Sequence, residues 1–172
     1  GEMVTATGYA GQLLATFNDG SVRLFELPSG SQQVSPFQPS LRPSQRIQWS
    51  TPAVHPDPDR GFVVLRDQRQ LFRVQILEQP RPHLAQMKQK QLPSPVYPQL
   101  AALGDAVVAV RRSAGHDSLV AYSWDELEEL EPPQLLIEGQ EIKTTQGGET
   151  TEEGETIEVQ VQSNWDLTGR VV

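Results

Sequence analysis

The chain has 172 residues, with 14 basic and 22 acidic side chains, a formal net charge of −8 and no cysteine. This length fits one domain or part of a larger one. The lack of cysteine excludes disulfides, Cys-ligated zinc and a cysteine nucleophile, but it leaves the cellular compartment open. The longest apolar runs are far below the ~20 residues of a membrane-spanning helix, so we expect no membrane span.

The acidity is confined to one stretch of the chain. Residues 1–124 hold 12 basic and 9 acidic side chains, residues 125–158 hold 1 and 12, and residues 159–172 hold 1 and 1. Like charges at this density repel one another and resist burial. We therefore predict an acidic, partly disordered insertion over 125–158, with a cation site or a docking surface for a basic partner as the alternative. The basic residues before it are scattered, which argues against a nucleic-acid surface.

Three β-hairpins are predicted along the first 124 residues. In the first, apolar segments at 13–17 and 21–27 flank Asn18-Asp19-Gly20, and Asp-Gly supplies the positive backbone dihedrals of a tight turn. Two similar pairs follow, at 61–65 with 70–77 and at 105–110 with 118–124. Further strands are predicted at 49–54 and 94–97. Short helices are predicted over 82–91 and 125–130, the latter with Ser123 as N-cap.

The hairpin turns recur at a regular spacing. Their centres lie near Asp19, Asp67 and Gly115, which are 48 residues apart each time (67 − 19 and 115 − 67). A fixed period of this size is typical of a repeat array. The units then cover about 1–45, 46–92 and 93–124, and the insertion at 125–158 is followed by the start of a further strand pair at 159–172.

The hairpin strands are apolar on both faces. Val22 and Leu24 point one way and Phe25 and Leu27 the other, because side chains alternate along a strand. Sheets covered on both sides are typical of β-propellers, whose blades stack face to face, whereas a sandwich more often shows one solvent face. We predict an all-β fold, a β-propeller-like repeat array of three to four antiparallel blades; a sandwich or an irregular barrel is the alternative.

Several segments resemble the repeats of the pyrroloquinoline-quinone-type, or quinoprotein-like, propellers and, more distantly, WD-type repeats. The matching segments are Leu24-Phe25-Glu26-Leu27-Pro28-Ser29-Gly30 with the preceding hairpin, Gln48-Trp49-Ser50-Thr51-Pro52-Ala53-Val54, its echo Pro93-Ser94-Pro95-Val96, and Trp165-Asp166-Leu167-Thr168-Gly169-Arg170-Val171-Val172. The family's glycine turn becomes Asp67-Gln68-Arg69 in the second hairpin. The vicinal cysteines and calcium-binding set that hold the quinone have no counterpart. The resemblance therefore implies the scaffold and no cofactor.

The number of units indicates an incomplete propeller. At 48 residues a unit the chain holds about 3.6 units, whereas propellers need 4 to 8 blades to close. We expect either an incomplete propeller or one completed by a partner, the partner being another protein or the remaining blades of the same propeller. The resemblance favours a non-catalytic scaffold segment that mediates protein–protein interaction. The alternative is a fragment of a quinoprotein-like enzyme or of a small-molecule-sensing propeller.

The residues that could carry chemistry form no complete site. His55, Asp57 and Asp59 have the alternate spacing of a cation loop, but Arg60 and Phe72 stand where a calcium loop needs glycine and glutamate. The neighbouring prolines favour a plain rigid turn. His83 and His116 lie in other loops, and Ser113, His116 and Asp117 crowd one turn too short to orient a catalytic triad. We therefore assign no catalytic, metal-binding or cofactor-binding residue.

The aromatic residues are predicted to serve packing, since a ring buries a large apolar area. Those inside predicted strands are expected in the core: Phe17, Phe25, Phe62, Phe72 and Tyr122. Trp49 and Trp165 are expected to pack between blades. Trp124, beside the acidic run, is the aromatic residue for which surface exposure is considered.

Overall fold

Ten β-strands and one short 3-10 helix make up the computed structural model, which describes residues 1–40, 47–113 and 116–131. No α-helix occurs in these ranges, so the predicted all-β class is confirmed. None of the helical segments within them has the length and apolar character needed to cross a membrane.

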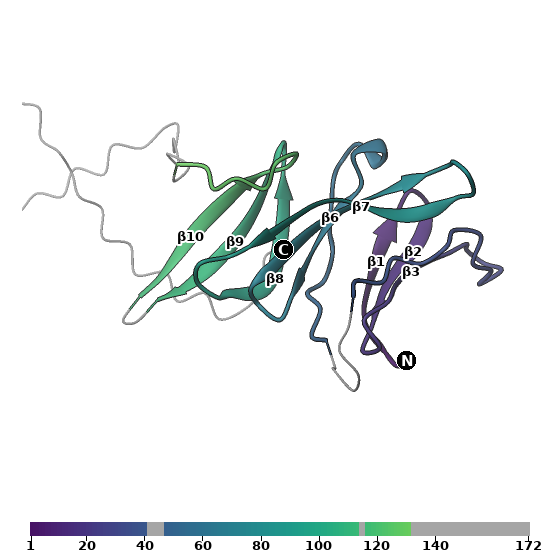
Figure 1. Cartoon of the computed structure of the whole chain (residues 1–172), viewed down its shortest axis with the longest axis horizontal. Helices are drawn as coiled ribbons and strands as arrows, with labels where there is room; N and C mark the ends of the chain where they lie inside the picture. Colours follow the sequence, from purple (N-terminus) through teal and green to yellow (C-terminus); the bar gives the residue numbers. More distant parts are fainter. Residues whose placement is uncertain (41–46, 114–115, 132–172) are drawn as a thin grey trace, which may run out of the picture. The chain divides into compact units, whose positions relative to one another are not determined.

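The strands form three antiparallel sheets in which consecutive strands are neighbours (Figure 1). Sheet A contains β1 (Met3–Tyr9), β2 (Gln12–Phe17) and β3 (Val22–Phe25). Sheet B contains β4 (Ala53–Val54), β5 (Phe62–Arg66), β6 (Gln70–Leu77) and β7 (His83–Gln91), with the 3-10 helix η1 (Pro58–Arg60) between β4 and β5. Sheet C contains β8 (Val96–Leu103), β9 (Ala106–Ser113) and β10 (His116–Ser123).

All three predicted hairpins are present, as β2–β3, β5–β6 and β9–β10. The first turn uses Gly20 with φ 84°, and the Asp19 carboxylate accepts hydrogen bonds from the Ser21 amide and hydroxyl. The second turn has no glycine. Asp67 and Gln68 there adopt φ 49° and 59°, the two positive values of a type I′ turn. The second hairpin therefore turns through two non-glycine residues of positive φ, whereas in the first turn only Gly20 has a positive φ.

Each hairpin occupies the same place in its sheet. The pairs Leu14–Leu24, Val64–Phe72 and Ala109–Val120 are centred on positions 19, 68 and 114.5, which are 49 and 46.5 residues apart. Each hairpin forms the second and third members of its sheet. A fourth member follows every time, as the Val22–Phe37 bridge, as β7, and as the Tyr122–Glu129 bridge. The same four-membered order thus recurs three times.

Sheet B is buried on both faces. Alternate side chains of β5 and β6, among them Phe62, Val64, Phe72 and Val74, join a hydrophobic cluster with sheet A. The residues between them, Val63, Leu65 and Leu71, join a second cluster with sheet C. A small sheet covered on both sides is what the sequence predicted.

Most of the aromatic residues expected in the core are there. Phe17, Phe62, Phe72 and Tyr122 are buried, whereas Phe25 is only partly covered. Trp49 packs edge-to-face on Phe72, at 5.9 Å between ring centroids, and so links sheets A and B through their shared cluster. Trp124, the residue considered for exposure, is 1% exposed. Trp165 lies outside the described residues.

Both predicted helices are wrong. Residues 83–91 form β7, because the free edge of β6 supplies hydrogen-bond partners along the whole segment. After β10 the chain makes a single turn in which the Ser123 hydroxyl accepts from the Glu128 amide, five residues on, whereas a helix N-cap would accept from the amide two or three residues on. The Leu130 amide then donates to the Ala121 carbonyl, so the segment pairs with β10 instead of continuing as a helix. Of the predicted insertion at 125–158 only 125–131 are described, and the strand pair at 159–172 lies outside the described residues.

The predicted strand at 94–97 is longer than expected, because β8 runs on to Leu103 and pairs with β9. No closed ring of sheets is present in the described part of the chain. The described residues form an all-β fold of three antiparallel sheets that share two hydrophobic clusters.

Candidate interaction site

The loop between β4 and β5 contains the cation-loop candidates, and its polar groups are used locally. His55 is 8% exposed, and its Nδ1 accepts a hydrogen bond of 2.9 Å from the Asp57 amide. The other ring nitrogen, Nε2, lies 3.4 Å from Asp105 Oδ1. The Asp57 carboxylate caps η1 by accepting from the Asp59 amide. In the described ranges no three His, Asp or Glu side chains are grouped so as to hold a metal ion.

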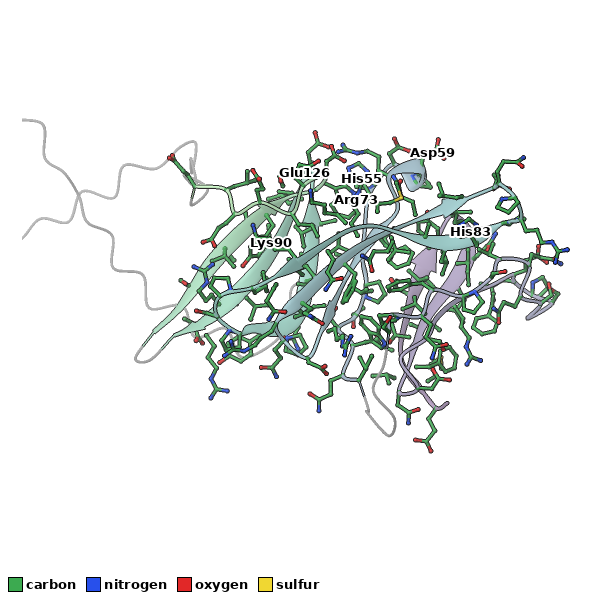
Figure 2. The ribbon with its side chains drawn as sticks, in the orientation of Figure 1. His55, Asp59, Arg73, His83, Lys90 and Glu126 are labelled. Atoms are coloured by element: carbon green, nitrogen blue, oxygen red, sulfur yellow. The ribbon has the colours of Figure 1, made fainter. Side chains whose placement is uncertain are left out.

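Arginine side chains from η1 and from sheet B reach carboxylates in the segments that flank the strands of sheet C. Arg60 pairs with Asp105 in the β8–β9 turn and with Asp125, whose Oδ2 lies 2.8 Å from the guanidinium. Arg73 on β6 lies 3.3 Å from the other oxygen of Asp125. A further pair joins Lys88 on β7 to Glu126. We call these six residues the B–C ion cluster; its members Arg73 and Glu126 are labelled in Figure 2, together with His55.

Trp124 adds a neutral connection between the same two sheets. Its indole Nε1–H donates to the Arg60 carbonyl at 2.9 Å, and its ring contacts His55 edge-to-face at 4.7 Å between centroids. Asp125, which follows it, is thereby placed next to Arg60 and Arg73. The start of the acidic stretch is consequently an ion-paired part of the sheet B–sheet C contact.

The pKa shifts in the B–C ion cluster favour permanent charges. Hydrogen bonds from His55 and then Arg60 lower the pKa of Asp105 below its ordinary value. The hydrogen bond to Asp125 raises the pKa of Arg60. General acid–base catalysis needs a group whose pKa lies near the working pH, and both of these pKa values move away from neutrality. The arrangement suits an electrostatic connection between two sheets better than proton transfer.

The other candidates from the sequence do not come together. His83 donates from Nδ1 to the Arg81 carbonyl at 2.8 Å, beside a shallow open hollow lined by Ser35, Pro80, Arg81 and His83. Asp117 accepts from the Tyr97 hydroxyl at 3.2 Å. The side chains of Ser113 and His116 lie outside the described part of the structure.

The outer face of sheet C is largely apolar, and the charged pair Arg112–Asp117 lies on it next to the β9–β10 turn. Paired residues of neighbouring strands share a face, so Ala101 and Leu103 of β8 lie with Val108 and Ala106 of β9. Val110 and Ala121 continue this face, together with Leu119 of β10. Leu103 is 67% exposed and Leu119 is 42% exposed, and neither belongs to the two hydrophobic clusters of the described residues.

The outer face of sheet A is also largely apolar. It carries Ala6, Leu13, Ala15 and Phe25, which lie opposite the buried set Leu14, Val22 and Leu24. Its one charged member is Arg23, which lies 4.4 Å above the Phe17 ring and pairs with Asp19. We take the outer faces of sheets A and C as the candidate interaction site.

Scans of the sequence against protein-family models and against curated proteins find no match. Sequence analysis anticipated that the strands would be apolar on both faces. It missed the B–C ion cluster, whose partners Arg60 and Asp125 are 65 residues apart. No local pattern connects residues at such a distance, and only the contact between the two sheets brings them together.

Proposed function

We propose that this chain is a segment of a β-propeller-like repeat array and serves as a non-catalytic scaffold for protein–protein interaction. The observation that carries the proposal is the contrast between the sheets. Sheet B buries both of its faces against neighbouring sheets, while the outer faces of sheets A and C belong to neither hydrophobic cluster of the described residues; Leu103 and Leu119 of sheet C are exposed, and Leu13 and Phe25 of sheet A are partly exposed. Contiguous exposed apolar surface of this kind is typical of an interaction site.

The recurrence of the four-membered order supports the propeller-like part of the proposal. In a propeller each blade is a small antiparallel sheet packed between two others. Sheet B has such surroundings, and the B–C ion cluster and Trp124 add specific contacts to the hydrophobic ones. The polar groups near the loops are occupied in these contacts, which supports a structural role for them.

A site-specific crosslinking experiment tests the scaffold function. Leu119 is replaced by a photo-crosslinking amino acid in cells of the source, and Met87 is replaced in a matched control. The two side chains are 42% and 43% exposed, but Met87 is the bulged residue of β7 and lies outside both outer faces. We expect one adduct of defined mass from position 119 and none from position 87.

Two results would contradict the proposal. An absence of adducts at position 119, with the fold intact by circular dichroism, would show that the outer face of sheet C contacts no protein. A rise in melting temperature of the purified chain with a quinone or with calcium would favour an enzyme or sensor fragment instead.

A further inference from the structure

The two contacts between sheets share one polarity. In sheets A and B, the residues that face the next sheet lie three or five positions from the hairpin centre: Leu14, Val22 and Leu24 in sheet A, and Val63, Leu65 and Leu71 in sheet B. We call this the leading face. We call the opposite face, whose residues lie four or six positions from the hairpin centre, the trailing face. In sheet B it carries Phe62, Val64, Phe72 and Val74, all of which face sheet A.

The leading face of sheet A packs on the trailing face of sheet B. The leading face of sheet B packs on sheet C through Val107, Ala109, Val120 and Tyr122, and we call this the trailing face of sheet C because it faces the preceding sheet. Among the described residues, two sheet faces pack on no other sheet. They are the trailing face of sheet A, with Leu13, Ala15, Arg23 and Phe25, and the opposite face of sheet C, with Val108, Val110, Leu119 and Ala121, which we call its leading face; Ala15 and Ala121 are the buried members of these faces.

The uncovered faces resemble the buried faces of the same polarity. Val108, Val110 and Leu119 make the free leading face aliphatic, as Val63, Leu65 and Leu71 do in sheet B. Phe25 brings an aromatic ring to the free trailing face, as Phe62 and Phe72 do in sheet B. One molecule thus presents both halves of a contact that it already makes twice internally.

We propose that a second copy of this chain adds head to tail, with the trailing face of its sheet A on the leading face of sheet C. The proposal rests on the scaffold function above and names its partner. Such a contact is heterologous, and heterologous contacts form a ring when the rotation between copies closes. Two copies supply six described sheets, which is within the 4 to 8 blades of closed propellers. The expected assembly is therefore a closed pair.

Sedimentation equilibrium of the full 172-residue chain tests the pair. We expect a mass of twice the 19.1 kDa monomer. Leu119→Lys places a charge on the free leading face and should halve the measured mass. Met87→Lys adds the same charge at an equally exposed position outside both faces and should leave the mass unchanged. Circular dichroism verifies that both variants fold.

Mixing two variants tests the polarity. Leu13→Lys damages the trailing face and Leu119→Lys the leading face, so each variant alone should be monomeric. A one-to-one mixture restores one undamaged contact, between the trailing face of the Leu119→Lys chain and the leading face of the Leu13→Lys chain. We expect the mixture to recover a two-chain species. If Leu13→Lys alone stays dimeric, the contact is not head to tail and the proposal is overturned.

The experiments distinguish an error in the proposed pairing of two copies from an error in the proposed scaffold function. A monomer at every concentration, together with a crosslink from position 119 to another protein, overturns the pair and leaves the scaffold function standing. A monomer in which a thiol introduced by Leu119→Cys does not react overturns the pair as well, because the face is then covered within one chain. The chain has no other cysteine, so this labelling is unambiguous.

Discussion

Replacing Gly61 with alanine is expected to be unusually destabilising. Gly61 follows η1 with φ 77° and ψ −144°, a combination that is essentially confined to glycine. Its amide donates to the Pro58 carbonyl at 3.0 Å, and its own carbonyl accepts from the His55 amide at 3.1 Å. The chain therefore cannot relax here without loosening the loop that carries His55 and Arg60.

The surroundings of Gly61 also leave no room for a side chain. A Cβ atom on Gly61 would lie 2.0 Å from the Val74 carbonyl oxygen of β6 and 2.7 Å from Gln75 Cγ. Backbone strain costs about 1–3 kcal/mol, and forced overpacking costs a further 1–3 kcal/mol or so. We expect Gly61→Ala to lower the free energy of unfolding by about 2–6 kcal/mol, a large part of the total of ~5–15 kcal/mol of a typical domain.

Urea unfolding, followed by tryptophan fluorescence, measures this loss. Gly30→Ala is the matched control, because Gly30 also has a positive φ of 71° but its Cβ would meet nothing within 4 Å. That variant should lose only about 1–2 kcal/mol, the cost of left-handed backbone for a residue with a Cβ. Equal losses in the two variants would refute the close approach of β6 to Gly61.

Three further predictions concern the contacts between and within sheets. Trp124→Phe loses the hydrogen bond to the Arg60 carbonyl and leaves a cavity at a side chain that is 1% exposed, so the free energy of unfolding should fall by about 2–4 kcal/mol in urea titrations; an unchanged value would contradict that bond. Asp125→Asn should cost less than about 1 kcal/mol, because Asp125 is 56% exposed, and the loss should shrink at high salt; a loss that salt does not alter would contradict an ion-pair origin. Burial opposes the shift at Asp19, but hydrogen bonds from Ser21 outweigh it and lower the pKa of Asp19 from 3.8 to about 2. Since the folded-state pKa is the lower one, Asp19 adds stability above pH 3.8 that is lost as the pH falls toward 2. The free energy of unfolding of Asp19→Asn should accordingly change less than that of the wild type between about pH 5 and pH 2, and parallel pH profiles would contradict this assignment.

The hairpins could be predicted because their signals are local. Asn18-Asp19-Gly20 between two apolar segments determines a turn and the register of its strands, and the repetition of this pattern predicted three similar units. The alternation of Val22 and Leu24 with Phe25 likewise indicated sheets with two apolar faces. These features need no knowledge of the rest of the chain.

The missed elements depend on distant partners. β7 contains Gln86, Lys88, Gln89 and Lys90, a composition with little strand propensity, and it is a strand because β6 offers it an unpaired edge. The acidic residue Asp125 looked solvated because its neighbours in sequence are acidic. Its basic partner Arg60 comes from a different sheet, so only the packing of sheets B and C shows that its charge is compensated.

The three sheets should differ in stability, because they differ in the number of neighbouring sheets that they contact. The stability of a linear array is approximately the sum of the intrinsic stabilities of its units and of the contacts between neighbours. Sheet B takes part in two such contacts, whereas sheets A and C take part in one each among the described residues. A second copy that covers both outer faces would give every sheet two neighbours. Because it would bind only the folded chain, the melting temperature should then rise with protein concentration, and it should do so in the Met87→Lys chain but not in the Leu119→Lys chain.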